Sequence, residues 1–316
     1  MNLLHIDRGQ IKTQPYEVFH MTRPSISFEF FPPKSLQASF RLWECVKTLA
    51  PMDPAFVSVT YGAGDTTNQL THDTVDAIVK SSDLQVAAHL TCIDATRHET
   101  LAIAADYNAS GVNYIVALRG DPPKGSSDYR IRADGFQSSI ELTAALANKG
   151  FDVTVGAYPE SHPNASNKQT CIDYLKAKID AGATRAIPQF FFEANTFLRF
   201  RDACADAGIT APILPGILPI ENWEGVQKFA VSCGVAIPKV IKDDFAKAND
   251  PDMINLLSKA HATELCDDLL SNSVDHLHFY TLNKHELTHS ICHALGITPD
   301  MRHQKVACLT LFGIKK

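Results

Sequence analysis

The 316-residue sequence predicts a single (β/α)₈ TIM barrel, because short apolar runs rich in β-branched and aromatic residues alternate with helical stripes eight times. The composition does not change along the chain in a way that would separate two domains. A doubly wound sheet is the alternative, but it favours a Gly-x-Gly-x-x-Gly turn after the first strand, and none occurs there. We expect an N-terminal arm over residues 1–22, the barrel over 23–297 and a tail over 298–316.

The expected strands are bounded by residues that stop a strand. Residues 25–31 form the first strand, and Pro32-Pro33 ends it by removing two backbone donors. A proline inside the sixth strand predicts that this strand is irregular. In chain order, the later strands are expected over residues 56–61, 85–90, 114–118, 153–158, 185–192, 213–217 and 277–280.

The helices between these strands follow from apolar residues at helical spacing. Thr96 with Glu99 three residues later predicts a capping box, and Gly111 suits the position after the end of that helix. In chain order, helices are expected over residues 36–49, 70–79, 96–109, 138–148, 172–179, 196–207, 223–232, 253–270 and 284–295.

The composition indicates which partners and which cellular environment are expected for this protein. The formal net charge of −6 argues against a surface for nucleic acid or anionic membrane. No apolar run is long enough to span a bilayer, and the first residues do not resemble a secretory leader. The eight cysteines occur singly, without a Cys-x-x-Cys pair, so we expect reduced thiols in a cytoplasmic protein.

Polar residues gather where the expected strands end, and in a barrel these ends share one rim that carries the chemistry. Each residue alone has a structural explanation, such as a hydrogen-bonded histidine or an ion pair at the rim. As a set, with cations, histidines and hydroxyls, they suit a large anionic cofactor with a diphosphate. The set comprises Glu29, Thr60, Tyr61, His89, Arg119, Gly120, Asp121, Tyr158, His162, Gln189, Tyr280 and Lys284.

Glu29 is the most informative of these residues because it lies inside an apolar strand. Burial opposes the charged form of a carboxyl group, so the sequence predicts a raised pKa for Glu29. One interpretation is an ion pair with a buried cation, and the other is a general acid.

A second motif points to different chemistry. His285-Glu286-Leu287-Thr288-His289 matches the His-Glu-x-x-His pattern of zinc proteases. The usual third ligand is missing, and the motif lies on the last expected helix, outside the barrel mouth. A zinc-dependent hydrolase is therefore an alternative that we do not favour, and a barrel that binds folate or flavin without catalysis is another. We assign no metal ligand.

Several ordered motifs together resemble the short, bacterial-type 5,10-methylenetetrahydrofolate reductases. They extend from about residue 24 to residue 297. In chain order they are Ser27–Pro33, Val57–Gly62, His89–Cys92, Leu118–Asp121, Tyr158–Pro163, Gln189–Phe192, Pro215–Pro219 and His278–Asn283. The family's fold is a (β/α)₈ barrel that holds FAD, in agreement with the strand pattern.

The resemblance implies an NAD(P)H-dependent reduction of 5,10-methylenetetrahydrofolate to 5-methyltetrahydrofolate, with ping-pong kinetics and non-covalent FAD. Such an enzyme supplies methyl groups for methionine synthesis, and we expect a homo-oligomer. Glu29 would be the general acid, and Asp121 would act beside the flavin and the folate. Cofactor contacts carry over to Tyr61, Ala63, His89, Arg119, Gly120, Asp121, Tyr158, His162, Ala165 and Lys178. Contacts with the nicotinamide nucleotide or the folate carry over to Thr60, Asp121, Gln189, Phe229 and Lys284.

Three positions depart from the family pattern. Cys171 stands where an Asp usually helps to hold FAD, and Pro188 stands where a Thr usually precedes the Gln-Phe-Phe motif. Lys284 replaces the usual Arg, so a contact with a folate carboxylate would lack bidentate geometry.

Overall fold

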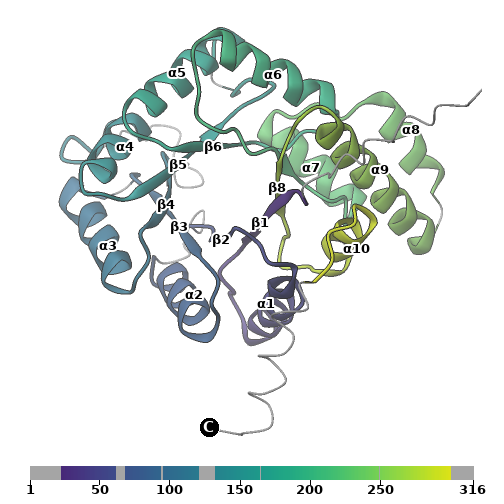
Figure 1. Cartoon of the computed structure of the whole chain (residues 1–316), viewed down its shortest axis with the longest axis horizontal. Helices are drawn as coiled ribbons and strands as arrows, with labels where there is room; N and C mark the ends of the chain where they lie inside the picture. The colour runs from purple at the N-terminus through teal and green to yellow at the C-terminus, as the bar shows by residue number, and fades with distance from the viewer. Residues whose placement is uncertain are drawn as a thin grey trace, which may run out of the picture.

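The computed structural model describes residues 23–61, 68–93, 95–120, 132–163, 165–248 and 250–299, which form one (β/α)₈ barrel (Figure 1). All pairings between the named strands are parallel, in the order β6-β5-β4-β3-β2-β1-β8-β7. The predicted fold is thereby confirmed. The strands are β1 Ser25–Phe30, β2 Phe56–Val59, β3 Val86–Thr91, β4 Tyr114–Leu118, β5 Asp152–Ala157, β6 Arg185–Pro188, β7 Gly216–Ile217 and β8 His276–Tyr280.

Helices surround the strands in sequence order, as Figure 1 shows. Most lie close to the predicted ranges, and the capping box of Thr96 with Glu99 is present at the start of α3. The helices are α1 Leu36–Leu49, η1 Ala50–Met52, α2 Asn68–Ser81, α3 Arg97–Ala109, α4 Ser139–Ala147, α5 Lys168–Asp180, α6 Ala194–Asp206, α7 Trp223–Cys233, α8 Lys239–Lys247, α9 Pro251–Ser271 and α10 Glu286–Ala294. The predicted arm over 1–22, and all of the tail over 298–316 except its first two residues, lie outside the described residues.

The ring of strands closes between β6 and β7 through a narrow seam. A single bridge joins Ala186 of β6 to Ile213, which precedes the two-residue strand β7. The Tyr280 hydroxyl of β8 reaches across this seam and donates a hydrogen bond of 2.7 Å to the carbonyl of Pro188. Gly216 makes room for that side chain, because a Cβ there would lie 2.5 Å from Tyr280 Cε2 and 2.6 Å from the Pro188 oxygen.

The seam explains why two strands are shorter than predicted. The sixth strand ends at Pro188 rather than at residue 192, because proline cannot donate to the ladder. The seventh includes only Gly216–Ile217 of the expected 213–217, since Pro215 interrupts the run.

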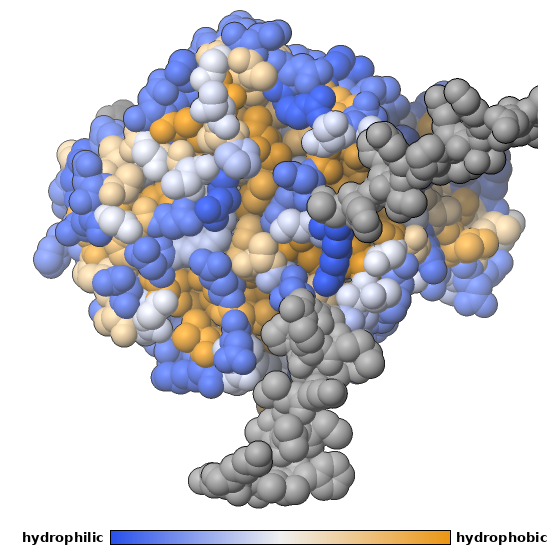
Figure 2. Space-filling model, in the orientation of Figure 1, coloured by the Kyte–Doolittle hydropathy of each residue, from blue (hydrophilic) through white to orange (hydrophobic). Residues whose placement is uncertain are grey.

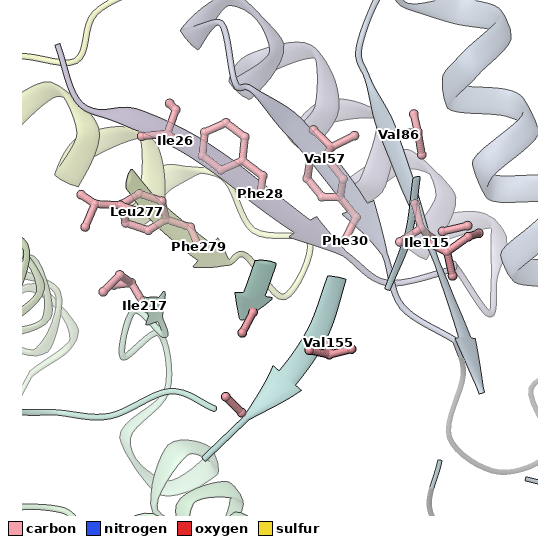
Figure 3. Close-up of a cluster of buried hydrophobic side chains, with 14 of the residues drawn as sticks. Ile26, Phe28, Phe30, Val57, Val86, Ile115, Val155, Ile217, Leu277 and Phe279 are labelled. Carbon is pink, nitrogen blue, oxygen red and sulfur yellow. The ribbon is translucent and has the colours of Figure 1, made fainter. Parts of the chain in front are cut away.

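The main apolar core lies between the strands and the surrounding helices. Alternate residues of β1 and β8 contribute to it: Ile26, Phe28 and Phe30 from β1, and Leu277 and Phe279 from β8 (Figure 3). All five are buried, and the rings of Phe28 and Phe279 lie 6.1 Å apart. Because side chains alternate across a strand, Ser27, Glu29, His276, His278 and Tyr280 are turned to the inside of the ring.

The inside of the ring is filled by aromatic and polar side chains. Phe56 of β2 packs against Tyr114 of β4 at 4.9 Å and stacks on His276 and His278 at 5.8 and 5.9 Å. The Arg185 guanidinium lies 4.6 Å from the centre of the Tyr114 ring and pairs with a carboxylate of β5. Side chains therefore fill the barrel interior at its N-terminal end.

A second apolar cluster covers the β7–β8 side of the barrel, where α7, α8 and α9 gather (Figure 1). The Trp223 ring of α7 stacks on Phe245 of α8 at 4.6 Å. Helix α8 was not predicted from the sequence. It begins after Pro238, has nine residues and buries only Ile241 and Phe245, so its apolar stripe is too short to be distinctive.

The face in Figure 2 shows apolar surface through its middle, interrupted and bordered by hydrophilic residues. Among the described cysteines, Cys45, Cys92, Cys171, Cys204, Cys266 and Cys292 are free thiols. Within the described part of the chain, no helix is both long and apolar enough to cross a membrane.

Candidate active site

Two adjoining cavities open at the C-terminal ends of the strands. The central cavity, of about 710 Å³, is lined by Glu29, Thr60, Tyr61, His89, Gln189 and Phe229 among others. The side cavity, of about 380 Å³, is lined by Arg119, Gly120, His162, Ala165, Cys171 and Lys178 among others. They share four lining residues: Leu118, Gly156, Ala157 and Tyr158. Nearly all described residues predicted for the site therefore meet around one opening.

Glu29 lies in the central cavity between two imidazoles. Its Oε2 is 3.3 Å from His89 Nε2 of β3 and 3.7 Å from His278 Nε2 of β8. Neither ring nitrogen has a hydrogen-bond partner among the described residues, and both side chains are buried. The Glu29 carboxylate therefore contacts both imidazoles at this end of the barrel interior.

The predicted direction of the Glu29 pKa is wrong. Burial raises this pKa, as expected, but interactions with His278 and His89 outweigh burial and lower the pKa from 4.5 to about 2. The carboxyl group is thus ionised at neutral pH in the protein without ligands. Sequence reasoning considered the strand around Glu29 but not the two histidines on other strands.

The other predicted residues of the central cavity present hydroxyl, amide and aromatic groups. The Thr60 hydroxyl is buried without a hydrogen-bond partner. Burial raises the pKa of Tyr61 to about 12, so its phenol stays protonated. Gln189 follows β6 directly, and Phe229 of α7, 43% exposed, stacks on Phe190 at 5.2 Å. Such a wall can bind a flat polar ring by stacking and hydrogen bonding.

The side cavity combines cations with an open glycine wall, which suits an anionic cofactor. Lys178 is only 5% exposed, and its ammonium donates to the carbonyl of Gly156. Burial lowers the pKa of Lys178 from 10.5 to about 8, because a charged ammonium is costly inside the protein. An anion bound beside Lys178 would reduce this cost. A Cβ on Gly156 would meet only Leu118 Cδ2, at 3.4 Å, so this wall has room for a ligand. Arg119 is exposed at the cavity edge.

Three further side-cavity residues are held by local contacts. His162 packs edge-on against Tyr158 with ring centres 4.7 Å apart, and its backbone N–H donates to Cys171 Sγ at 3.3 Å. The backbone N–H of Ala165 donates to the His162 carbonyl. Gly120 has a φ of +87°, and a Cβ there would lie 2.6 Å from Ile93 Cγ2, so only glycine fits.

Lys284 does not line either of these cavities. It lies in a neighbouring cavity of about 870 Å³, where its Nζ is 3.7 Å from Glu221 Oε2. Asn283 lines both this cavity and the central one. Two other predicted residues, Asp121 and Ala63, lie outside the described residues.

The His-Glu-x-x-His motif has a different arrangement from a zinc site. His285 precedes α10, and His289 packs against His293, one turn further along the helix, with ring centres 4.5 Å apart. Among the described residues, no group of three or more His, Cys, Asp or Glu side chains is placed to hold a metal ion.

Sequence reasoning missed two groups that shape the site. Ser27 and His278 were quoted only as parts of motifs, although alternation along β1 and β8 places both on the same side as Glu29. Asn283 was missed as well. Its side chain bonds both the N–H and the carbonyl of Phe31, at 2.9 and 2.8 Å, and so holds the end of β1 beside β8.

Comparison with known proteins agrees with this geometry. The family model described as methylenetetrahydrofolate reductase matches residues 16–296. The 5,10-methylenetetrahydrofolate reductase of Pectobacterium carotovorum subsp. carotovorum is 43% identical over 282 residues, covering 88% of this chain and 92% of the relative. The protein of the same name from Escherichia coli strain K12 is 42% identical over 278 residues, covering 88% of this chain and 92% of the relative.

A solved structure shares the fold at lower identity. An uncharacterised protein from Clostridium thermocellum, described as binding two copies of 5-methyl-5,6,7,8-tetrahydrofolic acid, superposes with a TM-score of 0.59 at 16% identity. The match covers 88% of this chain and 96% of that one. The sequence similarity to the reductases is far stronger and spans the barrel and both cavities. This chain belongs to the methylenetetrahydrofolate reductase family.

Proposed function

We propose that this protein reduces 5,10-methylenetetrahydrofolate to 5-methyltetrahydrofolate, with non-covalent FAD as cofactor and NADH or NADPH as the source of electrons. The observation that carries the proposal is the buried Glu29 carboxylate, flanked by two imidazoles and facing a cavity that also presents Gln189 and Phe229. The identity of 42–43% to the bacterial reductases supports the same reaction.

The side cavity would hold the charged part of FAD. Lys178 and Arg119 supply positive charge, Gly156 leaves the wall open and Tyr158 links this cavity to the central one. When bound, FAD supplies the hydride chemistry that no side chain can provide. We also propose that Asp121 acts beside this cofactor and the folate, and that Tyr61, Ala63, His89, Gly120, His162 and Ala165 contribute contacts.

The central cavity would receive the nicotinamide nucleotide and the folate in turn, which supports ping-pong kinetics. Thr60, Gln189 and Phe229 face the same space as Glu29, so a flat ring bound there lies near the acid in either half-reaction. Lys284, in the neighbouring cavity, would reach the folate tail.

The residues around Glu29 provide the proton that opens the five-membered ring of the folate. N10 leaves readily only when protonated, so a general acid is needed in the folate half-reaction alone. Because the interactions with His278 and His89 hold the pKa of Glu29 well below its usual range, Glu29 by itself would rarely carry a proton at pH 7. The acid is therefore the cluster of Glu29 with His89 and His278, in which an imidazole stores the proton and Glu29 directs it.

The test separates the two half-reactions in Glu29→Gln, which keeps the shape and removes the acid. Stopped-flow bleaching of bound FAD by NADH should be near normal, whereas reoxidation by methylenetetrahydrofolate should slow by at least about 100-fold. Ser58→Ala, at the β2 position paired with Glu29, is the control for a change inside the barrel. Equal slowing of both half-reactions would assign Glu29 a structural role instead.

The cofactor is tested independently by the visible spectrum. The protein should purify yellow, and Arg119→Ala and Lys178→Met should each retain less flavin. Lys176→Met is the matched control, because Lys176 is exposed on the same helix and pairs with Asp180. Full flavin occupancy in both cavity variants would contradict the placement of FAD.

A further inference from the structure

A line of hydrogen-bonding side chains runs from Glu29 along the inside of the barrel. The Ser27 hydroxyl lies between two imidazoles, 2.7 Å from His278 Nδ1 and 2.8 Å from His276 Nε2. His278 then faces Glu29 with its other nitrogen, at 3.7 Å. Ser27 and His278 have no exposed surface, and His276 is 8% exposed. The line therefore joins the active-site carboxylate to the opposite end of the barrel.

The hydroxyl between the rings can serve both charge states of His278. When His278 is neutral, with its proton on Nε2, Ser27 donates to Nδ1 and accepts from His276 Nε2–H. When His278 carries a proton on Nδ1, this Nδ1–H donates to Ser27, and the Ser27 hydroxyl donates to Nε2 of a neutral His276 whose own proton is on Nδ1. The Ser27 hydroxyl and the two ring nitrogens that it contacts keep a hydrogen bond in either state, and losing one would carry a cost.

The surroundings keep His276 neutral. Burial, then the nearby His278 and Arg185, lower the pKa of His276 to about 3. Arg185 of β6 pairs with Asp152 at 2.9 Å, and Phe56 of β2 stacks on both imidazoles. A neutral His276 can accept a hydrogen bond from Ser27 without placing a second positive charge beside protonated His278.

We propose that Ser27 and His276 are positioning residues that enable His278 to store the proton that Glu29 delivers to the substrate. The inference rests on the proposed role of Glu29 as the group that directs the acid. Water at His276, which is more exposed than Ser27 and His278, supplies the stored proton. His276 takes up a proton on Nδ1, its Nε2 proton passes to the Ser27 oxygen, and the Ser27 proton passes to His278 Nδ1. In the transfer step, the Nε2–H bond of His278 breaks and a proton forms a bond with Glu29 Oε2. The imidazolium becomes the neutral tautomer with its remaining proton on Nδ1, which still donates to Ser27, and the carboxylate becomes a neutral carboxyl group.

Few charged or titratable groups among the described residues face Glu29 and His278. Glu29 is approached by His89 of β3 and by His278 and Tyr280 of β8. Burial, with Glu29 close by, raises the pKa of Tyr280 well above its usual value, so its phenol stays neutral. The pH dependence of the folate half-reaction should therefore report the Glu29–His89–His278 cluster.

The experiment compares Ser27→Ala and His276→Phe with the native protein by two readouts. The first is single-turnover reoxidation of the reduced enzyme by methylenetetrahydrofolate across pH. Its high-pH limb should move down by about one pH unit, with about 10-fold slowing at neutral pH and unchanged bleaching by NADH. The second is NMR of histidine labelled with ¹⁵N in the ligand-free protein, where the His278 titration should shift in the same direction.

The control variants distinguish a specific effect on His278 from a general loss of folding stability. Ser58→Ala removes another buried hydroxyl inside the barrel, one without a hydrogen-bond partner, and should leave both readouts unchanged. His276→Gln keeps a partner for Ser27 and should restore most of the rate. Loss of stability in Ser27→Ala with an unshifted His278 titration would overturn the inference. If Glu29→Gln itself left the folate step intact, the proposed acid would fail, and the NMR shift would still report on Ser27 and His276.

Discussion

Gly216→Ala tests whether the seam between β6 and β7 depends on the Tyr280 hydrogen bond. The added methyl group would lie 2.5 Å from Tyr280 Cε2, 2.6 Å from the Pro188 oxygen and 2.7 Å from the Tyr280 hydroxyl. The ring must therefore move and break its 2.7 Å bond to Pro188. Overpacking costs about 1–3 kcal/mol, and an unpaired buried polar group costs a further ~1–3 kcal/mol.

The loss of backbone freedom in the unfolded chain offsets about 0.4–1 kcal/mol of this cost. We expect the free energy of unfolding to fall by about 2–5 kcal/mol, measured by urea denaturation followed by circular dichroism. Gly225→Ala is the matched control, because its nearest neighbour would be at an ordinary 3.4 Å, and this helical site should become slightly more stable. If both variants were within about 0.5 kcal/mol of the native protein, the seam would not depend on Tyr280.

Three other outcomes follow from features of the structure described above. The pKa of Lys178 is about 8 in the folded protein and 10.5 in the unfolded chain, so the unfolded chain binds more protons between these pH values. The free energy of unfolding, measured by urea titration, should therefore rise by about 3 kcal/mol from pH 8 to pH 10.5, and this rise should be absent in Lys178→Met. Thr96→Ala removes the cap bonded to the Glu99 N–H and should cost about 1 kcal/mol in the same assay, and an unchanged midpoint would contradict the capping role. Lys284→Met should raise the folate KM by no more than about fivefold, since Lys284 is exposed and already faces Glu221, and steady-state kinetics with unchanged FAD bleaching would check this.

The sequence predicted the fold well because strand boundaries depend on local chemistry. Pro32-Pro33 after β1 and the capping box of α3 act within a few residues, and the structure has both where they were expected. The short strand β7 and helix α8 were poorly predicted, since packing across the seam and against Trp223 decides them. Such contacts join segments that are distant in sequence.

In the site as well, features that depend on local sequence were predicted, and features that depend on distant segments were not. The strand-end rule placed Glu29, His89 and Gln189 around one cavity, and the structure confirms this placement. The charge on Glu29 could not be predicted from its own strand, because it depends on imidazoles brought in by β3 and β8. Lys284 lies in the neighbouring cavity because β8 ends at Tyr280, so the three residues that follow direct the chain outward.

The narrow seam is held by fewer backbone contacts than the other strand pairs of the described barrel. Neighbouring strands elsewhere in the described barrel are joined by paired registers. At the seam, β6 is joined to Ile213, just before β7, by one bridge, and to Tyr280 of β8 by one side-chain hydrogen bond. Small opening motions of the ring should therefore concentrate at this joint. Gln189 follows β6 on one side of it, and Phe229 belongs to the helix after β7 on the other. Opening motions at this joint would widen the central cavity, where the two substrates of the proposed reaction would replace one another. The amides of Ala186 and Leu214 should be the first barrel amides to exchange with deuterium.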